Sequence, residues 1–161
     1  MTHRDITSSD RGILEELLTR SYQPLRDLNE PPWIPGEGMW QDYDDRIFDN
    51  LVKTDECVFL TESNYTVVGF ASFTRKESEA TIGRNSVLPE HGGKGIGSGQ
   101  VAEIIRRCIA LNLTTIHVMT GTHRFFNPAQ RMYLKAGFRE ISRDDDGQGV
   151  GRILVRYRLD H

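Results

Sequence analysis

Four glycines and one lysine fall within the six residues Gly92–Gly97, after a strand-like run and before a helical pattern. Glycine allows positive φ and lets a ligand come close to the backbone. The unpaired N–H groups at a helix start, together with the positive end of the helix dipole, attract phosphate. Lys94 adds a positive charge beside them. This segment therefore predicts a site for a pyrophosphate group.

Two common nucleotide motifs do not fit this turn. A P-loop requires Ser or Thr directly after its lysine, whereas Lys94 is followed by Gly95. The dinucleotide fingerprint requires Gly-x-Gly-x-x-Gly after the first strand of a βαβ unit. Read from Gly93, that frame ends in Ser98, and the turn lies in the middle of the chain. Nucleotide hydrolysis and dinucleotide binding are both disfavoured.

The frame that fits is Val-x-Pro-x-x-x-Gly-x-Gly-Ile-Gly, which begins at Val87 and ends at Gly97. It resembles the acetyl-CoA motif of the GNAT N-acetyltransferase superfamily. A segment about forty residues further on, Ala129–Phe138, is similar to the second motif of that family. The two motifs occur in the family's order, and the predicted elements match its fold over nearly the whole chain.

The resemblance implies that acetyl-CoA is the acyl donor and that its pantetheine arm pairs with the strand before the turn. The implied pantetheine contacts are Ser86, Val87 and Leu88. The implied pyrophosphate contacts are Gly92, Gly93, Lys94, Gly95, Ile96, Gly97 and Ser98. Asn127 is a further cofactor candidate, and no metal is implied.

Two positions depart from the family pattern. The family usually has Gln or Arg just before the first glycine of the motif, where this chain has Gly92. Its usual asparagine, seven residues before the tyrosine, is replaced by Phe126, and Asn127 comes one residue later. We therefore expect Lys94 and the backbone to carry more of the cofactor binding.

Transfer requires a neutral amine to attack the thioester and a proton for the departing thiolate. Tyr133 matches the family's usual general acid, and a phenol of pKa ~10 is suited to a thiolate whose acid has a pKa of ~8.5. The base is less defined. Glu79, near the start of the strand that precedes the turn, and His123 are candidates, and a reaction without a dedicated base is the third option.

The elements that must hold these residues follow from periodicity and turn signals. Strands are expected at 4–6, 57–61, 66–73, 80–88, 114–120, 138–143 and 152–158, and the principal helices start near residues 13, 40, 96 and 127. This order predicts an α+β fold: a GNAT-like mixed, mostly antiparallel sheet, splayed in its middle and flanked by about four helices. Residues 1–161 are expected to form one acyltransferase domain.

The N-terminal half is expected to supply the acceptor site. Pro24 predicts that the first helix ends near residues 21–22 and that a Pro-rich loop covers residues 23–38. Trp33 in this loop is a substrate candidate, whereas Trp40 is expected in the core. The acidic face of the following helix suggests an anionic rim for a cationic amine, and the alternative is an ordinary solvated helix face.

Composition limits the partners. The net charge of −3 argues against nucleic acid, although residues 1–80 carry 16 acidic and 8 basic side chains and residues 81–161 carry 7 and 12. No apolar run approaches membrane-spanning length. Cys57 and Cys108 lie far apart, Cys108 on the apolar face of a helix, so a buried thiol and a cytoplasmic location are expected.

The sequence thus predicts an N-acetyltransferase that moves an acetyl group from acetyl-CoA to a primary amine, more readily a small molecule, with Tyr133 as the general acid. The alternative is a non-catalytic module that binds acyl-CoA and acts as a sensor. A homodimer is the default expectation for the assembly.

Overall fold

The computed structural model describes residues 1–28, 36–144 and 154–161, in which seven strands form one sheet in the order β1-β2-β3-β4-β5-β7-β6. The strands are β1 (Thr2–Asp5), β2 (Glu56–Ser63), β3 (Thr66–Lys76), β4 (Glu79–Val87), β5 (Thr115–Gly121), β6 (Arg139–Arg143) and β7 (Leu154–Asp160). The α-helices are α1 (Ile13–Leu28), α2 (Met39–Asp49), α3 (Ile96–Ala110) and α4 (Asn127–Lys135), and the 3-10 turns are η1 (Ser8–Asp10), η2 (Pro89–His91) and η3 (Arg124–Phe126).

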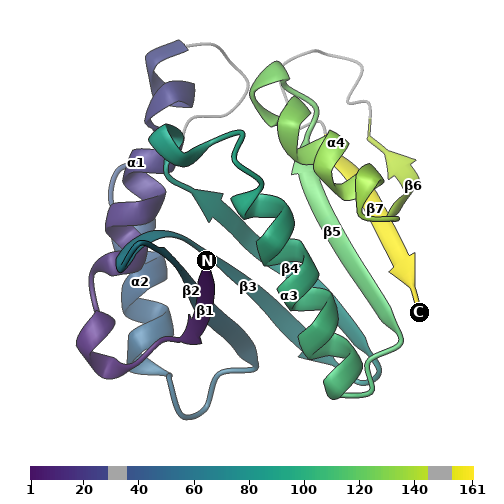
Figure 1. Ribbon diagram of the computed structural model, residues 1–161, viewed down its shortest axis with the longest axis horizontal. Coiled ribbons are helices and arrows are strands. Elements are labelled where there is room, and N and C mark those ends of the chain that lie inside the picture. The colour runs from purple at the N-terminus through teal and green to yellow at the C-terminus, as the bar shows by residue number, and fades with distance from the viewer. Residues whose placement is uncertain (29–35, 145–153) are drawn as a thin grey trace.

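The sheet is mixed, as predicted. Neighbouring strands are antiparallel everywhere except between β4 and β5, which run parallel. In Figure 1, β4 and β5 converge at the end where both begin and diverge toward the ends that carry η2 and η3. The acidic, glycine-rich composition of residues 144–149 predicts a turn, but only Asp144 of this segment is among the described residues.

Two apolar clusters, one on each face of the sheet, form the core. Strand β2 illustrates how they divide, because successive side chains point to opposite faces. Phe59 belongs to the cluster that includes residues of α3 and α4, whereas Val58 and Leu60 belong to the cluster that includes residues of α1 and α2. Trp40 is 4 % exposed and belongs to the second cluster, and Cys108 is fully buried in the first, so both side chains lie in the core as predicted.

Helix α1 is longer than the sequence predicts. It continues through Pro24 to Leu28 instead of ending near residues 21–22. A proline inside a helix lacks the N–H that would bond four residues back, which disfavours this arrangement. Leu25 is 2 % exposed in the core, and its burial offsets that loss. The predicted Pro-rich loop is correspondingly shorter, and its residues 29–35, including Trp33, lie outside the described part of the chain.

The acidic face of α2 holds α1 in place instead of forming an anionic rim. The Asp44 carboxylate is 2 % exposed and accepts hydrogen bonds from the backbone N–H groups of Gly12 (2.9 Å) and Leu14 (3.1 Å) at the start of α1. Arg11 pairs with Asp45 (3.0 Å) and Asp49 (2.5 Å). These carboxylates satisfy groups on α1, so the predicted anionic rim is wrong for Asp44, Asp45 and Asp49.

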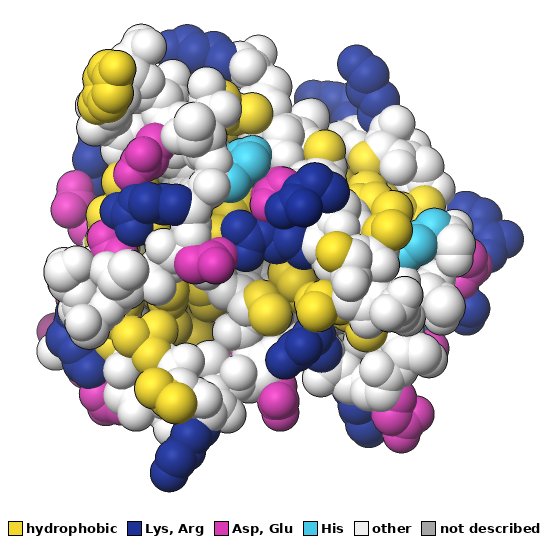
Figure 2. Space-filling model, turned by 60° about the horizontal axis from the view of Figure 1, so that its bottom comes forward, with side chains coloured by type: hydrophobic (Ala, Val, Ile, Leu, Met, Phe, Trp, Pro, Cys, Tyr) yellow, Lys and Arg dark blue, Asp and Glu magenta, His cyan; other side chains and the backbone are white. Residues whose placement is uncertain are grey.

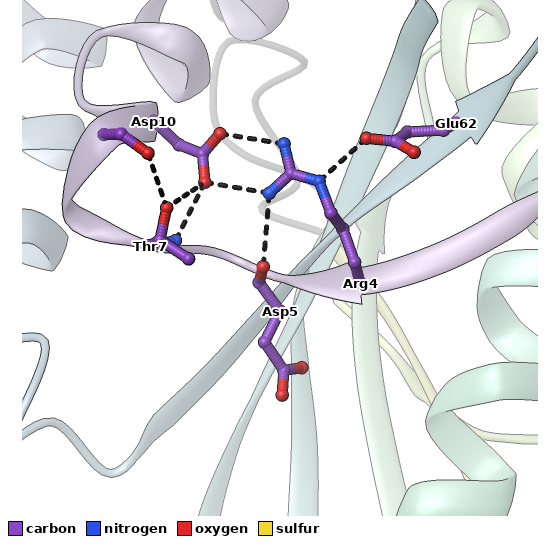
Figure 3. A network of polar contacts seen from close by, with 6 residues as sticks. Arg4, Asp5, Thr7, Asp10 and Glu62 are labelled. Carbon is purple, nitrogen blue, oxygen red and sulfur yellow. Dashed lines mark hydrogen bonds and ion pairs between the residues drawn. The ribbon is translucent and has the colours of Figure 1, made fainter. Parts of the chain in front are cut away.

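The N-terminal strand is fastened by one arginine (Figure 3). The Arg4 guanidinium donates to both carboxylate oxygens of Asp10 (2.9 and 2.8 Å), to Glu62 (2.7 Å) and to the backbone oxygen of Asp5 (3.3 Å). This pairing holds the pKa of the Asp10 carboxyl well below its usual value. The network joins β1, η1 and β2, and it is structural, because none of these side chains lines the large cavity described below.

On the face shown in Figure 2, Lys and Arg side chains alternate with Asp and Glu side chains. That face therefore carries no single-sign basic patch of the kind that binds nucleic acid. In the described parts of the chain, none of the helices is both long and apolar enough to span a lipid bilayer.

Candidate active site

Strand β4 is paired on both sides for only part of its length. Its first four residues, Glu79–Ile82, pair with Thr115–Val118 of β5. Beyond them β4 keeps only its pairing with β3, up to Val87. The edge of Gly83–Val87 that faces β5 therefore has no strand partner in the described structure, and its polar backbone groups are available to an extended ligand.

A β-bulge at Gly83 marks the point where the two strands part. Ser72 of β3 pairs with Arg84 and Phe73 pairs with Ile82, so Gly83 is the extra residue. A bulge bends its strand and increases the local twist. A Cβ at Gly83 would lie 2.9 Å from the Ser72 hydroxyl oxygen, so the position is also packed too closely for a side chain. Sequence reasoning missed this residue, although a glycine inside a strand is the usual signal.

The gap opens into a cavity of about 980 Å³ that reaches both faces of the sheet. Its walls are contributed by α1, β4, the glycine turn, α3, β5, η3 and α4. Of the predicted cofactor residues, eight line it: Ser86, Val87, Gly92, Gly93, Gly95, Ile96, Gly97 and Ser98. The tertiary structure thus brings the strand edge and the glycine turn into one cavity.

The glycine turn has the geometry expected of an anion site. Gly93 and Gly95 have φ of 70° and 80°, values that residues other than glycine rarely adopt. The first bond inside α3 runs from the Gly99 N–H to the Gly95 oxygen (2.9 Å), so the N–H groups of residues 96–98 lack helical acceptors. Gly92 differs, because its φ of −60° and ψ of 154° are accessible to any residue.

Three predicted cofactor residues do not line the cavity. The Lys94 amine donates to the backbone oxygen of Glu90 (2.9 Å). Leu88 is 3 % exposed, and its side chain packs in the core. Asn127 is the first residue of α4, which the chain enters through η3, and Phe126 is the N-cap of this helix.

Two cationic side chains of α4 line the cavity, whereas Lys94 does not. They are Arg131 and Lys135, and sequence reasoning did not select them. Arg131 and Lys135 are four residues apart, a spacing that puts two side chains on the same helical face. That spacing, inside a segment already singled out as a motif, was the available signal.

Tyr133 lies in the same cavity and is 4 % exposed. Its ring packs against Phe138 (5.7 Å between ring centres) and Tyr157 (6.2 Å). Burial raises the pKa of the phenol well above its usual value; nearby Tyr22 raises it further, and a side-chain hydrogen bond with Asn85 opposes the rise. The phenol is therefore protonated throughout the physiological pH range and is a hydrogen-bond donor.

The two candidate bases have different surroundings. Glu79 lies at the opposite end of β4 from the glycine turn, outside the cavity lining, and its carboxylate is 3.3 Å from Nε2 of His117. His123 does line the cavity, but its Nδ1 accepts a hydrogen bond from the Phe125 N–H (3.2 Å). In the neutral ring the proton then belongs on Nε2, so the only basic lone pair is already engaged.

Two aromatic side chains, Tyr22 and Phe125, line the α1 side of the cavity. Tyr22 of α1 packs on Phe125 of η3 (5.9 Å between ring centres) and on Trp40 of α2 (5.0 Å). Among the described residues that line the cavity none is Asp or Glu, whereas Arg84, Arg131 and Lys135 are all cationic. Trp33, the predicted substrate residue, falls outside the described residues.

A mixed sheet that parts beside a helix N-terminus, with Tyr133 in the lining of the gap, fits the acyltransferase class anticipated from the two motifs. The family model described as the acetyltransferase (GNAT) family matches residues 22–138. The chain belongs to the GNAT acetyltransferase family and is accordingly an acyltransferase. A search of curated protein sequences found no match.

Solved structures share the fold over almost the whole chain. A GNAT-family protein from Desulfovibrio desulfuricans superposes with a TM-score of 0.81 at 16 % identity, covering 99 % of this chain and 98 % of its own. The PaiA N-acetyltransferase from Thermoplasma acidophilum, solved with coenzyme A, superposes with a TM-score of 0.77 at 16 % identity, covering 99 % of this chain and 98 % of its own. The yncA protein from Salmonella typhimurium, solved with acetyl-CoA, superposes with a TM-score of 0.75 at 18 % identity, covering 99 % of this chain and 93 % of its own.

Proposed function

We propose that this chain transfers the acetyl group of acetyl-CoA to a primary amine of a small acceptor by direct attack. The observation that carries the proposal is the meeting, in one cavity, of the unpaired edge of β4, the free N–H groups at the start of α3 and the Tyr133 phenol. Each of these groups suits a different part of an acyl-CoA.

The donor would bind along β4 and the glycine turn. The pyrophosphate would accept hydrogen bonds from the N–H groups of residues 96–98, with Arg131 and Lys135 supplying positive charge. The amide groups of the pantetheine arm would pair with the free edge of Gly83–Val87, as an added strand pairs with a sheet edge. The thioester would then lie near Tyr133.

The reaction removes one proton from the amine and adds one to the departing thiolate. The neutral amine attacks the thioester carbonyl, the nitrogen loses a proton, and the sulfur of the departing CoA gains one. Tyr133 is suited to donate to that sulfur, because its raised pKa keeps the phenol protonated. The described lining holds no carboxylate, and Nδ1 of His123 is already engaged, so no side chain is assigned as the base and the amine would lose its proton to solvent.

Removal of the phenol oxygen tests the assignment. Tyr133→Phe keeps the ring packing and should lower kcat about 100-fold or more, with little change in the KM for acetyl-CoA. Tyr157→Phe is the matched control, because Tyr157 packs on the same ring but does not line the cavity. Thiol release from acetyl-CoA over a panel of amines is the assay.

Two outcomes would contradict the proposal. Unchanged turnover of Tyr133→Phe at every pH would remove the tyrosine from the reaction. Tight binding of acetyl-CoA without amine-dependent thiol release would favour the sensor function instead. The small size of the acceptor, homodimerisation and a cytoplasmic location stay predictions.

A further inference from the structure

Arg84 lies on the wall of the cavity, next to the bulge at Gly83. Its guanidinium carbon is 5.3 Å from the ring centres of both Trp40 and Tyr43, which belong to α2. The next residue, Asn85, points to the other face of the sheet, where it donates to the Gly97 oxygen (3.1 Å). Arg84 therefore faces the α1–α2 side, and Asn85 faces the side of the glycine turn.

The charge of Arg84 is without a carboxylate partner among the described residues. Contacts with aromatic rings hold a guanidinium in place but do not neutralise it. Glu56, whose buried carboxylate also contacts Tyr43, is already engaged: it accepts hydrogen bonds from the Tyr43 hydroxyl (2.8 Å) and from Arg46 (2.9 Å). Arg84 is half-buried, so its unpaired charge has only partial access to solvent.

The phosphate groups of the cofactor are a poor explanation for this residue. Arg84 precedes the end of β4 at Val87 by three residues, which is about 10 Å along a strand. It also points to the face opposite the glycine turn. The anion that Arg84 is placed to hold must therefore enter from the acceptor side of the cavity.

We propose that the acceptor is an amine that also carries a carboxylate, as an amino acid does, and that Arg84 binds this carboxylate. This inference rests on the proposed function and names its substrate class. A planar guanidinium matches a carboxylate through two parallel hydrogen bonds. A polyamine would meet Arg84 and, in the described lining, no Asp or Glu. The aromatic rings of Tyr22 and Phe125 suit an apolar side chain on the acceptor.

Matched acceptors test the class directly. Thiol release from saturating acetyl-CoA is measured with each common amino acid, its amide and its decarboxylated amine, and with spermidine. We expect kcat/KM for at least one amino acid to exceed that of its own amide and amine by about 10-fold or more. Faster turnover of the decarboxylated amines or of spermidine would overturn the inference while leaving the proposed function intact.

Variants assign the effect to the residue. Arg84→Gln should raise the KM for the amino acid about 10- to 100-fold while the KM for its amide and for acetyl-CoA changes less than about threefold. Arg84→Lys keeps the charge but loses the two parallel hydrogen bonds, so its KM for the amino acid should lie between those of the parent protein and of Arg84→Gln. Arg75→Gln removes an exposed arginine of β3 as the control. An equal loss for amino acid and amide would mean that Arg84 only supports the fold.

A binding measurement decides the inference if no amine is turned over. Calorimetry of the CoA-loaded protein with N-acetylated amino acids should detect at least one that binds, with its affinity reduced about 10-fold or more by Arg84→Gln. Absence of such binding, or binding that Arg84→Gln leaves unchanged, would overturn the carboxylate site. Failure of turnover alone would instead count against the proposed function.

Discussion

The structure separates glycines that look equivalent in the sequence, and this difference can be tested by single alanine substitutions. Gly95 is the N-cap of α3 with φ of 80°, whereas Gly92, three residues earlier, has φ of −60°. Gly38, the N-cap of α2, has φ of 73° and lies outside the cavity lining. It is a matched control for backbone strain without a role in the site.

The expected magnitudes follow from these conformations. A Cβ at Gly95 or Gly38 would meet nothing within 4 Å, so the cost of alanine is conformational. It is about 1–2 kcal/mol, offset by roughly 0.4–1 kcal/mol from the stiffer unfolded chain. Both variants should therefore lose about 1 kcal/mol of stability. At Gly92 a Cβ would lie 3.1 Å from the Pro89 oxygen, which is a tight contact. Its cost about cancels the stabilisation from the stiffer unfolded chain, so the free energy of unfolding should change by no more than about 0.5 kcal/mol.

The cofactor affinity should respond differently. If alanine in place of Gly95 changes the conformation of the turn, the N–H groups of residues 96–98 no longer point toward the pyrophosphate. Loss of one hydrogen bond to a charged group costs about 1.5–3 kcal/mol. Gly95→Ala should thus raise the KM for acetyl-CoA about 10-fold or more. Gly38→Ala and Gly92→Ala should change it less than about threefold.

Denaturant unfolding and steady-state kinetics on the three variants provide the measurement. The assignment of the anion site to the start of α3 would be refuted if Gly92→Ala or Gly38→Ala raised the KM as much as Gly95→Ala. Equal stability of Gly95→Ala and the parent protein would refute the strain argument by itself.

Two other predictions concern Lys94 and Cys108. Lys94→Ala should change the KM for acetyl-CoA less than about twofold, because the Lys94 amine donates to the Glu90 oxygen and does not line the cavity. Arg131→Gln should raise the same KM about two- to fivefold. If steady-state kinetics gave the reverse order, Lys94 and not Arg131 would be the pyrophosphate contact. Burial raises the pKa of the Cys108 thiol to about 11, so at pH 8 only about one molecule in a thousand carries the thiolate, and a disulfide reagent should modify Cys108 in the folded protein only slowly. That rate should rise with pH and jump on unfolding, and fast modification of the native protein at pH 8 would contradict the burial.

Much of the fold could be predicted because its signals are local. The apolar period of α3 and the alternation of the strands depend on neighbouring residues, and these elements begin and end within a few residues of the predicted bounds. The end of α1 was not predicted, because Pro24 disfavours a helix locally while Leu25 favours it through the core. Packing energy outweighed local preference there.

The candidate site divides in the same way. Most of the glycine turn and Tyr133 line the cavity, because a turn between strand and helix fixes where its backbone points. Glu79 does not, because it lies at the far end of β4 beside His117, and Lys94 does not, because its amine donates to the Glu90 oxygen. Such pairings depend on which groups meet in space, and residue types alone do not define them.

By itself the sequence determined the family: a glycine-rich turn at Gly92–Gly97 and a tyrosine about forty residues later occur in an order that resembles one superfamily. Only the tertiary structure decided the electrostatics of the acceptor side. There Asp44 caps α1 from a position 30 residues away from Leu14, and Arg84 lines the cavity without a carboxylate partner among the described residues. Local propensity encodes a motif, but the charge of a cavity is what remains after distant residues have neutralised one another.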